Sequence, residues 1–310
     1  MKPLAASTPN TGRPSVLLIA RVGLTVLFVA GAIYSVQAGW HQIADYNWRL
    51  NPPLVAVAML LFVAATLLGN MIWLLLMRSF GAHIALRPAL RVYCTSNLGK
   101  YLPGKVWHVF ARIYLAQQYG APVARATSGS VADVLIFVAA GCVVSVLALP
   151  TLLDWAIEAP LLIGLMLVAT TVIGALLHPV ILNALFDFAG RYVSKLDDVR
   201  LEVGFPSILR IFGLDLALWG LICGGVYTAV HSVAPVSIDH APTLAAIYAV
   251  SYTSGLIMPL APAGLGVREG ATIFFLAPLV GAPAAVVSTA LIRVLQVLAE
   301  SLCAAVFSRL

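Results

Sequence analysis

The sequence has too few charged residues for a soluble protein. Asp, Glu, Lys and Arg make up 10% of its 310 residues, whereas a soluble domain carries about 25%. Hydrophobic residues make up 61%, and the mean hydropathy is +0.99. A chain of this composition cannot cover a water-exposed surface, which excludes a soluble enzyme. It can be stable where lipid is the surrounding solvent, so we expect a polytopic integral membrane protein.

Signatures of metal and redox chemistry are also missing. The four cysteines form no CxxC, and the six histidines form no HExxH or other closely spaced pair. No G-x-S-x-G nucleophile motif occurs. The segment from Gly99 to Lys105 has the glycine and lysine spacing of a P-loop, but Val106 stands where such a loop needs Ser or Thr. The sequence therefore predicts no metal, no cofactor and no catalytic residue.

Long apolar runs occupy most of the chain. A helix that crosses a bilayer needs about 20 apolar residues. The first run is too long for the core of a signal peptide and is not followed by an A-x-A cleavage site, so we expect it to remain as a span. The predicted spans are 16–38, 54–77, 126–149, 160–177, 208–230 and 284–307.

Basic residues predict how these spans are oriented. Arg78, Arg87 and Arg91 follow the second span without an acidic residue, and the positive-inside rule places this connection in the cytoplasm. The connection 150–159 holds two acids and no base, so we expect it outside. Both termini are then cytoplasmic, in a bacterial inner membrane. The net charge of +6 reflects this orientation, and we expect no nucleic-acid partner.

The domain organisation is predicted to be simple. A cytoplasmic tail, 1–15, precedes one transmembrane domain, 16–310. Two regions of that domain, 92–119 and 242–283, are apolar but broken by proline and glycine. The first is flanked by cytoplasmic bases and the second begins and ends outside. We therefore expect an all-α bundle of about six full spans and two re-entrant hairpins that form a possible inverted repeat. Eight full spans are the alternative.

The two broken regions predict a central cavity. Backbone N–H and C=O groups without helical partners are tolerated at membrane depth only inside protein or beside a wet cavity. The N-termini of half-helices that meet there would favour an anion. In both regions a proline–glycine break precedes an arginine, Arg112 in the first and Arg268 in the second. We therefore expect an anion site where the two breaks meet.

Three arginines are the strongest candidates for such a site. Arg293 lies well inside the last apolar run, where an arginine costs about 2.5–3.5 kcal/mol on insertion scales. With Arg112 and Arg268 it could bind a lipid phosphate, because the guanidinium fork matches phosphate oxygens. The alternative is a structural ion pair with an acid of another segment: Asp215, Glu269 or Glu300.

Other polar residues extend the predicted site. Arg293, Gln296 and Glu300 recur at three and four residues and should face the bundle interior. Glu269 and Asp133 are candidates for binding a coupling proton. Two lysines flank the first proline–glycine break and could attract an anionic headgroup, or could extend to the cytoplasmic interface: Lys100 and Lys105.

The sequences around the breaks resemble a known family. NLGKYLPG at 97–104, followed by Arg112, and PAGLGVRE at 262–269 resemble the flippase-like transmembrane domain of lysylphosphatidylglycerol synthases. The resemblance covers nearly the whole chain and implies a multi-pass fold that moves amphiphilic lipids between leaflets. Val134 follows Asp133 where the family usually has an acidic–basic pair, which leaves open whether Asp133 forms an ion pair. With the chain ending at Leu310, we expect no synthase half and no lysyl transfer.

These observations predict a lipid translocase that moves an anionic or amphiphilic lipid, or a lipid-linked headgroup, through the cavity. The alternatives are an intramembrane enzyme that acts on a lipid headgroup, and a non-transporting membrane partner of a lipid or glycan biosynthesis enzyme. The expected partners are membrane lipids. The predicted ligand-binding residues come from both motifs and the neighbouring spans: Asn97, Lys100, Tyr101, Pro103, Gly104, Lys105, Arg112, Asp133, Gly264, Gly266, Arg268, Glu269 and Arg293.

Overall fold

All regular structure in the described part of the chain is helical. The computed structural model contains eight α-helices and two short 3-10 turns there, which confirms the prediction of an all-α bundle. The predicted tail 1–15, the span 16–38 and most of the span 160–177 lie outside the described residues. The described residues are 50–101, 106–148, 204–257 and 266–309, with scattered positions between 168 and 184.

Among the described residues, four long helices are apolar enough to cross a bilayer. Their ends lie within three residues of four of the predicted spans. Three of them begin with a proline in the first turn, where the missing N–H group has no helical partner to lose. The long helices are α3 (Pro52–Ser79), α6 (Val123–Ala148), α9 (Phe205–Val233) and α12 (Ala282–Phe307).

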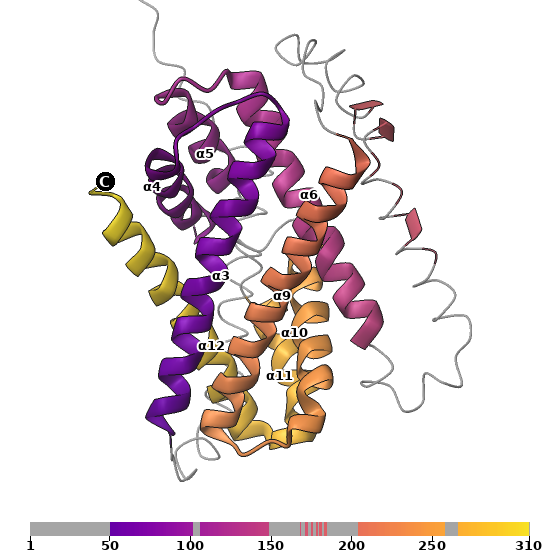
Figure 1. The fold of residues 1–310 in the computed structure, drawn as a ribbon. Coiled ribbons are helices and arrows are strands. Elements are labelled where there is room, and N and C mark those ends of the chain that lie inside the picture. The colour runs from indigo at the N-terminus through magenta and orange to yellow at the C-terminus, as the bar shows by residue number, and fades with distance from the viewer. Residues whose placement is uncertain are drawn as a thin grey trace, which may run out of the picture.

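Four shorter helices form two pairs (Figure 1). At 1.5 Å per residue they are about 17–26 Å long, less than the roughly 30 Å of a hydrocarbon core. A 3-10 turn, η1 (Leu98–Tyr101), continues the first helix of the first pair. The pairs are α4 (Leu86–Asn97) with α5 (Trp107–Gln117), and α10 (Ala241–Ile257) with α11 (Val267–Val280).

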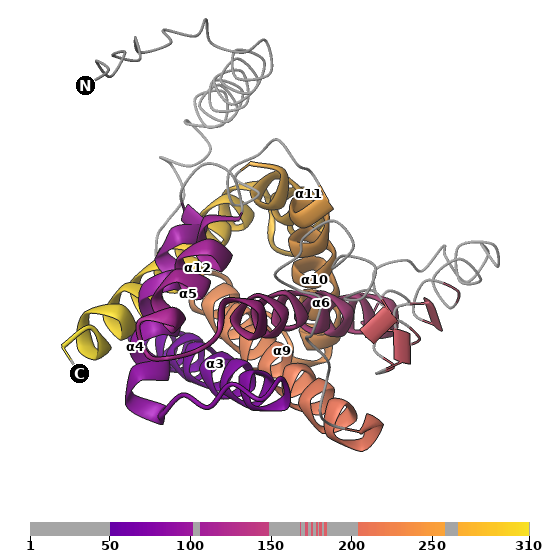
Figure 2. The same ribbon diagram turned by 90° about the horizontal axis from the view of Figure 1, so that it is seen from above.

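The described helices follow the order long, short, short, long twice, in α3 to α6 and in α9 to α12. The two units run in opposite directions, because the N–H of Asn51 before α3 donates to the carbonyl oxygen of Ser232 near the end of α9 (3.0 Å). Helix α3 packs along α9 on the side of the bundle that faces the viewer in Figure 1. Helix α4 packs on α3 and α12, whereas α10 packs on α6 and α9, so the short pairs occupy different sides (Figure 2).

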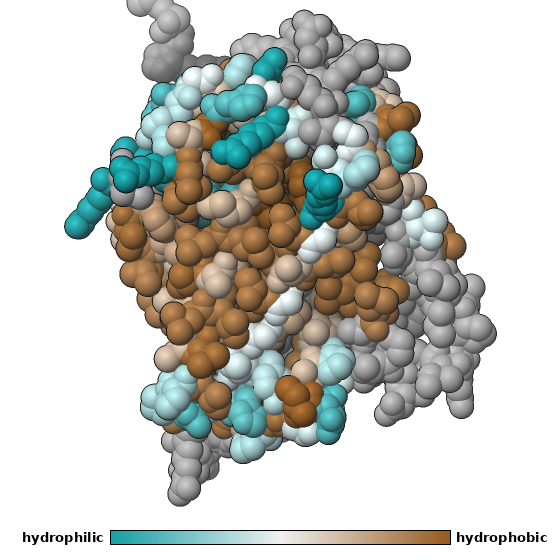
Figure 3. All heavy atoms as spheres, in the orientation of Figure 1, coloured by the Kyte–Doolittle hydropathy of each residue, from teal (hydrophilic) through white to brown (hydrophobic). Residues whose placement is uncertain are grey.

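The surface has the polarity of a membrane protein. Figure 3 shows a belt of hydrophobic residues across the middle of one face, with hydrophilic residues at both ends. Large apolar side chains are well exposed on different helices, including Leu60 at 67% and Phe274 at 73%. In water such surfaces would be unfavourable, whereas hydrocarbon accommodates them.

A glycine on α9 allows α3 and α9 to approach closely. A Cβ atom at Gly225 would lie 2.7 Å from Cε1 of Phe62, whose ring is buried. Gly220 and Gly224 of the same helix form a GxxxG pattern, which is typical of close helix packing. A Cβ at Gly220, however, would have no described atom within 4 Å. At Gly224 it would make an ordinary 3.5 Å contact with Leu61. The close contact therefore lies one residue beyond the GxxxG pattern.

These two glycine positions give a matched stability test. We expect Gly225→Ala to lower the thermal unfolding temperature of the purified protein in detergent, because the buried Phe62 ring must move. Gly220→Ala should leave it unchanged or raise it, since Ala favours a helix interior by about 1 kcal/mol over Gly. Tryptophan fluorescence during heating measures both. Equal unfolding temperatures for the two variants would contradict the assigned contact.

Candidate functional site

A cavity of ≈ 380 Å³ lies between the two short-helix pairs and the long helices. Its volume falls in the range of small-molecule sites, about 300–1,000 Å³. Part of its wall is apolar and comes from α3 and α9, including Phe62, Leu218 and Ile222. The charged side chains in its wall come from η1, α5, α6, α9, α11 and α12: Lys100, Arg112, Asp133, Asp215, Arg268, Arg293 and Glu300.

Arg112 is the most heavily bonded of these residues. It is 2% exposed, and its Nη1 lies 2.6 Å from Oδ2 of Asp133 on α6. Its Nη2 donates to Oδ1 of Asn97 (2.7 Å), and its Nε donates to Oγ of Ser96 (3.3 Å). Its guanidinium carbon lies 4.2 Å from the ring centroid of Tyr93. All three guanidinium nitrogens therefore have partners within the protein.

The Arg112–Asp133 pair answers a question that the sequence left open. Val134 stands where the family pattern would supply a base next to Asp133. The base comes instead from α5, and the ion pair joins the first short pair to α6. Asp133 therefore forms an ion pair despite this departure from the family pattern.

Removing one partner of this buried pair should destabilise the protein. Asp133→Leu leaves the Arg112 charge uncompensated, which costs about 3–5 kcal/mol in comparable buried pairs. We expect a clear fall in the free energy of unfolding in micelles. The double variant Arg112→Met with Asp133→Leu should recover part of this loss, because neither charge remains. A double variant no more stable than Asp133→Leu would show that the pair is not the source of the effect.

Arg268 differs from Arg112 in having only neutral partners. It is 8% exposed, and its Nη2 donates to Oε1 of Gln296 (2.9 Å) and to the hydroxyl of Tyr248. Its guanidinium carbon lies 4.8 Å from the ring centroid of Tyr248 and 4.5 Å from that of Tyr252. Within the described ranges it forms no ion pair with a carboxylate. The charge of Arg268 is therefore held in place without being neutralised.

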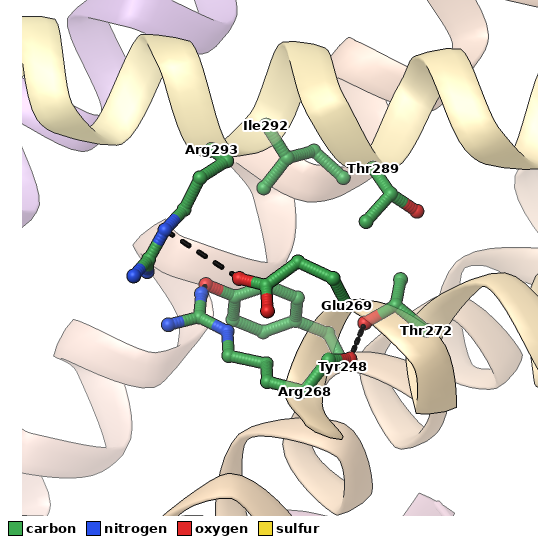
Figure 4. A pocket seen from close by; sticks show the side chains of 7 residues that line it. All are labelled: Tyr248, Arg268, Glu269, Thr272, Thr289, Ile292 and Arg293. Atoms are coloured by element: carbon green, nitrogen blue, oxygen red, sulfur yellow. Dashed lines mark hydrogen bonds and ion pairs between the residues drawn. The ribbon is translucent and has the colours of Figure 1, made fainter. Parts of the chain in front are cut away.

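Glu269 connects the start of α11 to α12. Its Oε2 accepts a hydrogen bond from the N–H of Gly266 (2.6 Å), and its Oε1 lies 3.5 Å from Nε of Arg293. Gly266 has φ of 87°, a conformation that favours glycine, so its part in the site is to form the turn. Figure 4 shows Glu269 and Arg293 pointing toward each other beside Arg268 and Tyr248, around a small pocket of ≈ 10 Å³.

Glu300 makes the corresponding contact with the first short pair. One of its oxygens pairs with Nζ of Lys100, and the other accepts from the hydroxyl of Tyr101 (2.9 Å). The guanidinium carbon of Arg293 lies 5.4 Å from the Tyr101 ring centroid. The polar face of α12 thus lies along the cavity, as its spacing predicts, and contacts both short pairs.

The structure brings together most of the predicted residues that it describes. Tyr101, Gly266 and Glu269 contact cavity-lining side chains or support their helix. Four predicted residues lie outside the described ranges: Pro103, Gly104, Lys105 and Gly264. Those that line the cavity are Asn97, Lys100, Arg112, Asp133, Arg268 and Arg293.

Sequence reasoning predicted Tyr101 but missed the two tyrosines that lie against Arg112 and Arg268. Tyr93 stacks on Arg112, and Tyr248 stacks on Arg268. Each tyrosine lies in the helix before a break and its arginine in the helix after it, 19 and 20 residues apart. This shared spacing was a usable signal. Asp215 was considered only as a counter-ion for an arginine, and the described residues give it no such partner.

The comparison with protein families agrees with the fold and the motifs. The family model described as the lysylphosphatidylglycerol synthase TM region matches residues 18–303. This protein belongs to that family, which confirms the resemblance drawn from the two motifs. No curated protein matches the chain. The four long apolar helices of its described part and this family together identify it as an integral membrane protein of a family associated with lipid handling.

Proposed function

We propose that this protein is a lipid translocase that moves an anionic or amphiphilic lipid, or a lipid-linked headgroup, between the leaflets of a membrane. The observation that carries the proposal is Arg268, a cation in the wall of an intramembrane cavity with only neutral partners among the described residues. A phosphate can bind there without displacing a carboxylate. Membership of a family named for a lipid synthase supports a lipid as the substrate.

The chemistry of the Arg268 neighbourhood suits a phosphate group. A guanidinium presents parallel N–H groups to phosphate oxygens, and such charge-assisted bonds are stronger in a low-dielectric site than in water. Arg293 lines the same cavity, and its buried Nη2 has no hydrogen-bond partner among the residues that the structure describes. The two arginines together can neutralise the headgroup while the acyl chains remain in hydrocarbon.

The supporting architecture is an inverted repeat of two four-helix units, α3 to α6 and α9 to α12. In this proposal the short pairs are re-entrant hairpins that enter from opposite sides, and the protein has six full spans in addition. The units run in opposite directions, and each places an arginine on a tyrosine at a similar spacing. Such repeats allow one site to open alternately to each side.

Helix α12 supplies contacts by which this opening can be controlled. Glu300 holds the first hairpin through Lys100 and Tyr101. Arg293 holds the second hairpin through Glu269. A lipid phosphate can compete with Glu300 for Lys100 or with Glu269 for Arg293. Binding of the headgroup would then loosen one hairpin at a time.

The proposed setting is a bacterial inner membrane with both termini in the cytoplasm. Arg78, Arg87 and Arg91 lie at the end of α3 and in α4, the end of the bundle assigned to the cytoplasm by the positive-inside rule. Lipids are the proposed partners, and the proposal includes no nucleic acid, no cofactor and no catalytic step. Pro103, Gly104, Lys105 and Gly264 remain predicted members of the site.

The geometry favours translocation over the two alternatives. An intramembrane enzyme would gain support from Glu269 placed beside a histidine or an aspartate, but its contacts are Gly266 and Arg293. A non-transporting partner would gain support from a bundle without a cavity, whereas these helices enclose one. We therefore propose neither.

Removal of the Arg268 charge tests the proposal. We expect Arg268→Gln to slow the transfer of labelled phosphatidylglycerol between the leaflets of reconstituted phosphatidylcholine vesicles roughly tenfold or more. A hydrogen bond to a charged group contributes about 1.5–3 kcal/mol. Its loss should slow transport at least tenfold, because about 1.4 kcal/mol corresponds to a factor of ten. Dithionite quenching of the outer-leaflet label measures the rate. Arg268→Lys should recover little of it, since an ammonium lacks the planar fork.

Arg78→Gln is the matched control, because Arg78 is an exposed arginine at the end of α3 and does not line the cavity. It should transport lipid at the wild-type rate. The proposal fails if wild-type vesicles move neither phosphatidylglycerol nor a polyprenyl phosphate faster than empty vesicles. It also fails if Arg268→Gln and Arg78→Gln behave alike.

A further inference from the structure

Asp215 is a buried acid for which the proposed phosphate site gives no role. It lies on α9, is 1% exposed and lines the central cavity. Its Oδ2 atom is buried and has no hydrogen-bond partner in the described part of the chain. A carboxylate without a partner in a protein interior is energetically costly, and binding a cation removes that cost.

The bases around the cavity are already engaged with other groups. Arg268 bonds to the neutral side chains of Tyr248 and Gln296. Within the described ranges no base forms an ion pair with Asp215. Ion pairs in or beside the cavity join Asp133 to Arg112, Glu269 to Arg293, and Glu300 to Lys100.

Within the described ranges, no base on the helices packed against α9 forms an ion pair with Asp215, because Arg293 of α12 is paired with Glu269. Helix α3 contributes uncharged residues to the cavity wall, among them Phe62 and Thr66. Asp133 of α6 is close enough for its charge to interact with Asp215, and this interaction is repulsive. The remaining titratable or charged residues that α10 and α12 place in the wall are Tyr248, Tyr252, Arg293 and Glu300.

The chemistry of the position indicates which cation would bind. A metal ion needs several oxygen or nitrogen ligands at once. The described residues contain no cluster of three or more His, Cys, Asp or Glu side chains that could hold one. A proton needs a single oxygen atom. Asp215 is thus better suited to a proton than to a metal ion.

We infer that Asp215 is the proton-binding residue of the cavity and that it couples proton binding to headgroup binding at Arg268. This inference rests on the proposed translocase function. Asp133 and Glu269, the acids that the sequence suggested for this role, are each held by an arginine. Asp215 is the acid that can gain or lose a proton without breaking an ion pair.

Coulomb repulsion provides the coupling. An anionic headgroup adds negative charge to a cavity that already contains Asp133, so it binds better when Asp215 is protonated and neutral. By linkage, bound lipid must in turn favour the protonated form of Asp215. A lipid with one negative charge and its proton would cross together without net movement of charge. A proton gradient can then drive lipid toward the side with fewer protons.

The pH dependence of binding tests this coupling in the purified protein, without transport. We expect the dissociation constant of dihexanoyl phosphatidylglycerol to rise roughly 5- to 150-fold as pH increases through the range in which Asp215 loses its proton, the span of typical coupling between sites. Asp215→Asn should bind at least as tightly as wild type and show no such rise, because asparagine stays neutral. Asp239→Asn, an exposed acid outside the cavity, is the matched control and should behave as wild type.

Infrared spectroscopy provides a second readout that needs no lipid. The carbonyl stretch of a protonated carboxyl group should be present in the wild type and in Asp239→Asn, and absent in Asp215→Asn. A dependence on pH that survives in Asp215→Asn, or the same carbonyl band in all three proteins, overturns the inference. The variant is nearly isosteric, and retained lipid binding shows that it has folded.

Transport experiments separate failure of this inference from failure of the proposed function. If vesicles move lipid at a rate that a pH gradient does not change, in wild type and in Asp215→Asn alike, proton coupling is wrong and translocation stands. If the wild type neither binds nor moves lipid, the translocase proposal fails. The coupling inference then fails with it, even where the infrared band assigns a proton to Asp215.

Discussion

Charged side chains inside a hydrocarbon-facing bundle must find their partners within the protein, and this constraint organises the whole centre of the molecule. An unpaired charge at membrane depth costs several kcal/mol, so each arginine, lysine and acid there has to be paired, solvated in a cavity or neutralised. Arg112 is paired with Asp133, and Lys100 with Glu300. Because each of these pairs joins different helices, the same interactions that accommodate the charges also position the short helices.

The two arginines that follow the breaks solve this problem in different ways. Arg112 has an acid, an amide, a hydroxyl and an aromatic ring around it, which makes it part of the permanent structure. Arg268 has hydroxyl, amide and aromatic partners but no paired acid in the described part of the chain. The arrangement is similar in the two units, yet among the described residues only the first arginine is paired with an acid. In the proposed function, the repeat therefore provides one structural cation, Arg112, and one binding cation, Arg268.

Helix α12 illustrates how much the residue pattern predicted. The spacing of Arg293, Gln296 and Glu300 predicts a single polar face directed inward, and all three line the cavity. Which partner each would take did not follow, because the partners belong to segments far away in the sequence. Glu300 contacts Lys100 across 200 positions, and Gln296 contacts Arg268 across 28.

The sequence by itself determined the class of protein, the four long helices and the places where helices break. These depend on apolar composition, on run length and on proline and glycine, which act locally. Only the tertiary structure decided that Asp133 belongs to Arg112, that Gly225 makes the close helix contact, and that no base in the described part of the chain forms an ion pair with Asp215. The physical reason is that pairing energies depend on distance in space between helices, and hydropathy along the chain carries no information about that distance.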